Sequence, residues 1–103
     1  MKVKTKQEVI EILSANLANL AKFGVSKVGL FGSFVREEQT ENSDVDLLIV
    51  LDNPDWNNYC HLLDFTDTLF DGRSTDIVTE RSLNEISGRN IFREVEFVNR
   101  SFR

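Results

Sequence analysis

The first quarter of the chain repeats apolar residues at the spacing of an amphipathic helix. Four positions carry this repeat: Val9, Leu13, Leu17 and Leu20. Thr5 and Glu8 stand just before it in the arrangement of a capping box, in which two side chains satisfy backbone N–H groups reciprocally. Gly24 follows the repeat and is a typical helix stop. The pattern therefore predicts one helix between Thr5 and Gly24, with its apolar face toward a core.

Three short apolar runs are typical of strands. Residues 27–31, 45–51 and 75–79 each have the length and composition of a strand, with β-branched residues in all three. The run 45–51 is apolar on both faces, which suits an interior strand covered on each side. Between the first two runs, Ser33 is predicted to be the N-cap of a brief helix, and residues 39–43 are predicted to form a polar loop.

A second long helix is predicted from Asp55 to about Phe70, with Asp71 and Gly72 ending it. Its apolar stripe is predicted to consist of four residues: Trp56, Tyr59, Leu63 and Phe70. This helix would separate the second and third strands along the chain. His61 lies outside the stripe, so we expect it to be exposed, and we assign it no catalytic role.

The last part of the chain is predicted to hold another helix cap and a final helical turn or two. These are indicated by Ser82 with Glu85, and by Ile91, Val95 and Val98. The final segment is expected to become extended near Phe97. The alternation of helices and strands predicts an α/β (α+β) fold, with helices packed on a small mixed sheet of three to four strands. At this length, residues 1–103 are expected to form a single domain.

Composition narrows the setting and the partners. The formal net charge of −5 argues against a broad electrostatic grip on nucleic acid, so no direct nucleic-acid binding is expected. The single Cys60 cannot form an internal disulfide, which suits a reducing cytoplasm. No apolar run is longer than 47–51, and residues 1–4 lack the apolar stretch of a signal peptide. We expect a soluble cytoplasmic protein without a membrane-spanning segment.

The strongest chemical signal joins a Gly-Ser turn to two closely spaced aspartates. Gly32 and Ser33 follow the first strand and can offer backbone N–H groups and a hydroxyl to a phosphate. Asp44 and Asp46 enter the next strand, where side chains two apart share a face at a Cα separation of roughly 7 Å. Asp76 opens the third strand and is the best third carboxylate. Such carboxylates can hold the two metal ions that promote an in-line displacement. Together with the Gly-Ser turn, they are typical of a nucleotidyl transferase.

The order of these features resembles that of a known family over nearly the whole chain. It consists of an apolar strand, Gly32-Ser33, Arg36, the run Ser43-Asp44-Val45-Asp46-Leu47, and Asp76 on a later strand. This order resembles the minimal nucleotidyltransferases of the DNA polymerase β superfamily. Those small proteins are often the antitoxin partners of HEPN-domain toxins. The resemblance implies a polymerase β-like fold, a HEPN-domain toxin as partner, and transfer of AMP from ATP to a hydroxyl of a protein.

The resemblance also assigns roles to individual residues. It implies that Gly32 and Ser33 contact the nucleotide phosphates, that Asp44 and Asp46 ligate magnesium, and that Asp76 completes the triad. On this hypothesis ATP is the substrate and two Mg²⁺ ions are the cofactors. Asp44 and Asp46 would bind both ions, while Asp76 would bind the acceptor-side ion and help to take the proton of the acceptor hydroxyl. Ser33 and the two amides would hold the β- and γ-phosphates.

Several residues keep more than one interpretation. Arg36 is as easily a helix-surface cation as a contact to nucleotide or partner, and Arg73 has the same two interpretations. Ser33 can cap a helix as well as bind phosphate. Glu37 stands where family members usually carry Gly, which indicates a helix that runs on or a loop that bends differently.

Other charged and aromatic residues have structural interpretations. The acidic group Glu37, Glu38 and Glu41 is interpreted as a solvated face. Five aromatic residues are assigned to the core: Phe31, Phe65, Phe70, Phe92 and Phe97. Phe97 and Phe102 are alternatively exposed residues of a partner surface.

Two other functions remain open from the sequence. One is a catalytically idle, transferase-like antitoxin that neutralises its partner by stoichiometric binding. The other is a small-molecule transferase, such as one acting on an antibiotic. Retention of all three acids favours an active protein adenylyltransferase, and the short chain counts against an added small-molecule site. The base preference, acceptor residue, oligomeric state and identity of the partner are not determined by the sequence.

Overall fold

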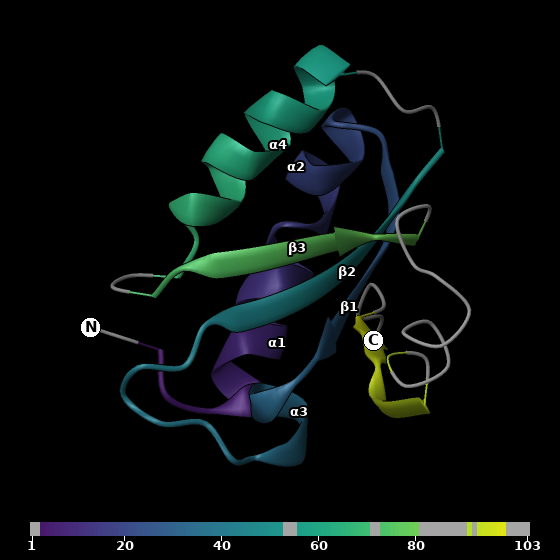
Figure 1. Cartoon of the computed structure of the whole chain (residues 1–103). Helices are drawn as coiled ribbons and strands as arrows, with labels where there is room; N and C mark the ends of the chain where they lie inside the picture. The colour runs from purple at the N-terminus through teal and green to yellow at the C-terminus, as the bar shows by residue number, and fades with distance from the viewer. Residues whose placement is uncertain (1–2, 53–55, 71–72, 81–90, 92, 99–103) are drawn as a thin grey trace.

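The structure is a four-stranded mixed sheet with helices packed on it (Figure 1). The computed structural model describes residues 3–52, 56–70, 73–80, 91 and 93–98. In chain order its elements are α1 (Lys6–Ala15), α2 (Leu17–Lys22), β1 (Val25–Phe31), α3 (Ser33–Arg36), β2 (Val45–Leu51), α4 (Trp56–Asp67), β3 (Thr75–Thr79) and β4 (Glu96–Val98). The strand order is β3-β2-β1-β4. Strand β1 is antiparallel to β2 and β4, and β2 is parallel to β3, which confirms the predicted mixed sheet.

The predicted first helix is two helices, so the expectation of one continuous helix was wrong. The capping box is present: the Thr5 side chain accepts from the Glu8 N–H, and Glu8 accepts from the Thr5 N–H. The break lies at Asn16, whose side-chain Nδ2 donates to the Ile12 carbonyl at 2.8 Å. A side-chain amide that bonds the backbone of the preceding turn competes with helical hydrogen bonds. One such residue interrupts a helix without disturbing the apolar repeat on which the prediction rested.

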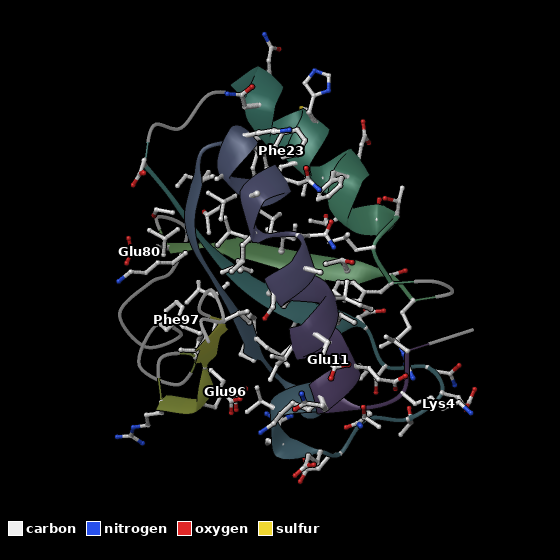
Figure 2. The ribbon with its side chains drawn as sticks, turned by 180° about the vertical axis from the view of Figure 1, so that it is seen from behind. Lys4, Glu11, Phe23, Glu80, Glu96 and Phe97 are labelled. Carbon is white, nitrogen blue, oxygen red and sulfur yellow. The ribbon has the colours of Figure 1, made fainter. Side chains whose placement is uncertain are left out.

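The core lies between the helices and one face of the sheet. Its fully buried members include Val9, Leu13, Leu20, Val28, Leu30, Phe34, Val45, Leu47, Ile49 and Leu62. These residues come from all four helices and from β1 and β2, and Figure 1 shows α1 and α2 behind the sheet. Phe23, at the end of α2, packs its ring 5.5 Å from the ring of Phe65 on α4 (Figure 2). Leu48, on the opposite face of β2, is also fully buried, which confirms an interior strand.

Helix α4 is shorter than predicted, and its predicted apolar stripe was wrong at one position. It ends at Asp67 rather than near Phe70, and the Thr68 hydroxyl donates to the Phe65 carbonyl at 2.7 Å. The fully buried apolar residue of α4 is Leu62, so the predicted stripe was wrong at Leu63, which is only partly buried. It was right at Tyr59, which packs against the core, and at Phe70, which is buried. Local hydroxyl bonds of this kind favour the end of a helix, and the apolar spacing alone does not register them.

The segment between β1 and β2 differs from the prediction at both ends of its short helix. Gly32, not Ser33, is the N-cap of α3, and φ of Gly32 is 81°. The helix stops after Arg36 because Glu37 takes the left-handed conformation, with φ of 58°. The helix therefore does not run on: Glu37 adopts the conformation that Gly would adopt more easily.

The remaining described segments follow the prediction. Strand β1 begins two residues earlier than expected, β2 and β3 match, and residues 39–43 form a loop. Strand β4 confirms extended chain at Phe97, which is 36% exposed, while Phe70 is buried. His61 is exposed. Within the described residues, no helix is long and apolar enough to cross a membrane.

Some predictions fall outside the described residues. They concern the first residues of the second helix at Asp55, the stop at Asp71 and Gly72, the cap at Ser82 and Glu85, the Trp56 side chain, and the aromatic residues Phe92 and Phe102.

Candidate active site

Adjacent parallel strands bring two of the predicted acids together. Asp46 of β2 and Asp76 of β3 are direct partners in the strand register. Their neighbours Leu47 and Ile77 pair next to them and belong to the core, so alternation turns both aspartates to the opposite face of the sheet. Asp44 stands one residue before β2 and is exposed, as is Asp76. The predicted triad is therefore gathered at one end of β2 and β3.

The surroundings of Asp46 disfavour its ionised form. Partial burial, followed by the negative charges of Asp76 and Asp44, raises the pKa of Asp46 to about 6. Glu94 adds to the rise, and Arg36 opposes it. A carboxylate that has more negative than positive charge around it binds a proton or a cation more readily. The site thus has a deficit of positive charge centred on Asp46.

Gly32 presses its backbone against that carboxylate. A Cβ added at Gly32 would collide with Oδ2 of Asp46 and lie 2.9 Å from its Cγ. The positive φ of Gly32 also disfavours any residue with a side chain. The close contact shows that the turn carrying the Gly32 and Ser33 amides lies directly beside Asp46.

Ser33 does not cap α3, which was the structural alternative to phosphate binding. It is the first residue of α3, and within the described chain this helix has no side-chain capping hydrogen bond. The side chain of Ser33 is partly buried. The interpretation of Ser33 as a helix cap was therefore wrong, because the glycine before it turns the chain and occupies the cap position.

Arg36 contacts two carboxylates rather than standing alone on the surface. Its Nε donates to Glu38 at 2.9 Å, and its Nη1 donates to Glu94 Oε1 at 2.8 Å. These hydrogen bonds, Glu38 first, raise the pKa of Arg36. The second oxygen of Glu94 accepts from the Gly32 N–H at 2.6 Å. Glu94 is thus a site residue that sequence reasoning missed, because it is 62 positions from Gly32 and lies outside any recognisable motif.

Arg73 is buried, so its interpretation as a surface cation was wrong. It is 7% exposed and donates from Nε to the Val3 carbonyl at 2.6 Å. Its Nη1 donates to the carbonyls of Thr40 and Ser43 at 2.9 and 2.8 Å. The guanidinium also lies 4.9 Å from the ring centre of Phe34 in α3. Arg73 therefore fixes the loop that leads into Asp44.

The donor set suits a divalent cation, although the side chains do not yet converge on one. Among the residues that the structure describes, no three acidic, histidine or cysteine side chains are arranged to hold a metal ion. Mg²⁺, however, is usually held by one or two carboxylates together with the phosphates of its ligand. Asp46 with either neighbouring aspartate meets that requirement, and the charge deficit at Asp46 is what a cation would relieve.

Comparison with known proteins places this chain in a family. The nucleotidyltransferase domain model matches residues 7–99. The chain belongs to the nucleotidyltransferase domain family. This nucleotidyltransferase domain is 35% identical over 100 residues to a protein adenylyltransferase, MntA, of Thermococcus cleftensis, covering 95% of this chain and 100% of that protein.

Solved structures share the fold. A candidate minimal nucleotidyltransferase superposes with a TM-score of 0.76 at 29% identity, over 89% of this chain and 94% of that chain. A toxin–antitoxin crystal structure with AMP-PNP superposes with a TM-score of 0.57 at 20% identity, over 93% of this chain and 73% of that chain. At that identity the second likeness concerns the fold alone. The family membership agrees with the fold class predicted from the sequence, a polymerase β-like nucleotidyltransferase fold.

Proposed function

We propose that this chain transfers AMP from ATP to a hydroxyl group of a partner protein, in the role of an antitoxin. The observation that carries the proposal is the pairing of Asp46 with Asp76, two residues from Asp44 and beside the backbone of Gly32. The full-length similarity to a protein adenylyltransferase supports the acceptor class. The toxin–antitoxin structures of the same fold support a toxin as the partner, and we infer a HEPN-domain toxin in the cytoplasm.

In the proposed reaction the acceptor oxygen attacks the α-phosphorus of ATP. A new P–O bond forms to the acceptor, the bond from the α-phosphorus to the bridging oxygen breaks, and pyrophosphate leaves with that electron pair. The acceptor's proton passes to Asp76, whose exposed carboxylate faces the site. The Gly32 and Ser33 amides, the Ser33 hydroxyl and Arg36 bind and orient the phosphates.

Asp44, Asp46 and Asp76 would hold magnesium in this site. When bound, Mg²⁺ would neutralise charge on the attacking and leaving oxygens. The aspartates' own contribution is to present carboxylate oxygens on one face, at a position where their mutual repulsion favours a cation.

The test is transfer of label from α-phosphate-labelled ATP to the protein encoded beside this chain, in the presence of Mg²⁺. We expect label on a hydroxyl side chain of that protein with the wild type, and none with Asp76→Asn. Asp64→Asn, which changes an exposed carboxylate of α4, is the matched control and should retain transfer. If Asp76→Asn silences a toxic neighbour in cells as well as the wild type does, stoichiometric binding is the better explanation.

A further inference from the structure

The Glu94 carboxylate occupies the groups that are proposed to bind phosphate. One oxygen accepts from the Gly32 N–H at 2.6 Å, and Arg36 Nη1 lies 2.8 and 3.1 Å from the two oxygens. Glu94 lies two residues before β4, so this contact joins the last described segment to the Gly32 turn. Two donors from one short stretch of chain therefore converge on one internal anion.

A phosphate oxygen and a glutamate oxygen cannot use these donors together. The Gly32 amide has a single N–H, and at 2.6 Å its bond to Glu94 leaves no room for a second acceptor along that direction. Arginine binds carboxylate and phosphate with the same fork of N–H groups. The chemistry that recognises Glu94 is thus the chemistry that would recognise a nucleotide phosphate.

The contact is placed so that it can open. The side chains of Arg36 and Glu94 are 48% and 27% exposed, so water can take over the bonds that either loses. Glu94 also stands close enough to Asp46 to repel its charge. Gly32 and Arg36 hold the Glu94 carboxylate in place against that repulsion. A ligand with more negative charge at the same donors can displace this carboxylate.

We propose that Glu94 is an internal competitor for the nucleotide phosphate and thereby sets the affinity and phosphate selectivity of the site. This inference rests on the proposed function. Triphosphate binds only after Glu94 leaves Gly32 and Arg36, so the apparent affinity is lower than the intrinsic one by the fraction of open protein. A ligand without phosphates, such as adenosine, does not meet this competition.

The test compares two charge-neutralising variants on neighbouring residues by calorimetric titration with ATP and Mg²⁺. Glu94→Gln removes the charge that competes at Gly32 and Arg36. Glu96→Gln removes the same charge from β4, where Glu96 lies beside Phe97 (Figure 2) and pairs with Lys6 at 3.1 Å. We expect roughly three- to thirtyfold tighter ATP binding for Glu94→Gln and an unchanged dissociation constant for Glu96→Gln.

A second variant keeps the charge and shortens the reach. Glu94→Asp lacks one methylene, so its carboxylate cannot span Gly32 and Arg36 in the observed way, and it should also bind ATP more tightly. In each protein adenosine affinity should stay at the wild-type value. If ATP binds the wild type and both Glu94 variants equally, or binds the variants more weakly, Glu94 is no competitor while the proposed function stands. If neither ATP nor tripolyphosphate binds any of these proteins, the nucleotide site itself is wrong.

Discussion

Two arginines make contacts in the segment between β1 and β2, and they hold their partners in opposite ways. Arg73 is buried, and its partners are backbone carbonyls of three residues that cannot leave without moving the chain. Arg36 is half exposed, and its partners are two carboxylates on side chains that can rotate away. The first arrangement fixes the loop before Asp44, whereas the second can exchange one anion for another. The segment between β1 and β2 thus carries both rigid and exchangeable contacts.

The largest expected effect separates these two arginines. Arg73→Met should lower the free energy of unfolding by about 3 kcal/mol or more, because several buried carbonyls would lose a charged donor. Arg36→Met should cost at most about 1 kcal/mol, since its ion pairs are exposed. Urea denaturation of both variants measures the difference. Equal losses would show that Arg73 is no more structural than Arg36.

Asp46→Asn should stabilise the protein at neutral pH while it removes a proposed metal ligand. The gain should be about 1–2 kcal/mol at pH 7, after solvent screening is allowed for, because burial and like charge disfavour the ionised form. The pKa of this carboxyl is near 4 in an unfolded chain and about 6 in the folded one. Protonated Asp46 therefore contributes stability that is complete below about pH 4 and is lost as the pH rises through about 6.

The control for that variant is Asp64→Asn, at an exposed position of α4. The free energy of unfolding of Asp46→Asn minus that of the wild type should grow between pH 5 and pH 7, and by more than the same difference for Asp64→Asn. If the difference in free energy of unfolding between Asp46→Asn and the wild type does not depend on pH, the proposed charge deficit at Asp46 is wrong.

Ser33 belongs with the exchangeable contacts, so its loss should be seen in binding rather than in folding. Ser33→Ala should weaken ATP binding in the presence of Mg²⁺ roughly tenfold, because a hydroxyl bond to a charged phosphate is lost. Its stability should change by less than about 0.5 kcal/mol, since no capping bond is removed. Ser33→Thr keeps the hydroxyl and should restore binding. A lower melting temperature with unchanged ATP affinity would make Ser33 structural.

The smallest expected effect concerns the end of α3, next to Arg36. Glu37→Gly should raise the free energy of unfolding by about 0.5–1 kcal/mol, because Gly takes the left-handed conformation without the cost that a side chain adds. The free energy of unfolding of Glu37→Asn should lie between those of the wild type and Glu37→Gly. Thermal unfolding of the three proteins checks the order. A destabilised glycine variant would mean that the Glu37 side chain itself supports the turn.

The sequence predicted those features that depend on local spacing. The capping box at Thr5 and the strands follow from spacings of two or three to four residues. The pairing of Asp76 with Asp46 was expected because the short strand that Asp76 opens could lie beside the strand that Asp46 enters. Prediction failed where one side chain bonds a carbonyl in its own helix, as Asn16 does, or where conformation is chosen at a single residue, as at Glu37.

The site's two long-range partners could not be predicted for a different reason. Arg73 reaches carbonyls 70, 33 and 30 positions away, and Glu94 reaches Gly32 across 62 positions. Neither contact leaves a trace in the local pattern, because a backbone group accepts or donates whatever its side chain is. Only the packed sheet brings such partners together.

The most direct measurement is calorimetric titration of ATP with and without Mg²⁺, for the wild type and for the double variant Asp44→Asn, Asp46→Asn. We expect Mg²⁺ to strengthen ATP binding by at least roughly tenfold in the wild type, because the clustered carboxylates need a cation before they accept a polyanion. The double variant should show no such strengthening. An equal effect of Mg²⁺ in both proteins would contradict the assignment of nucleotide transfer to these aspartates.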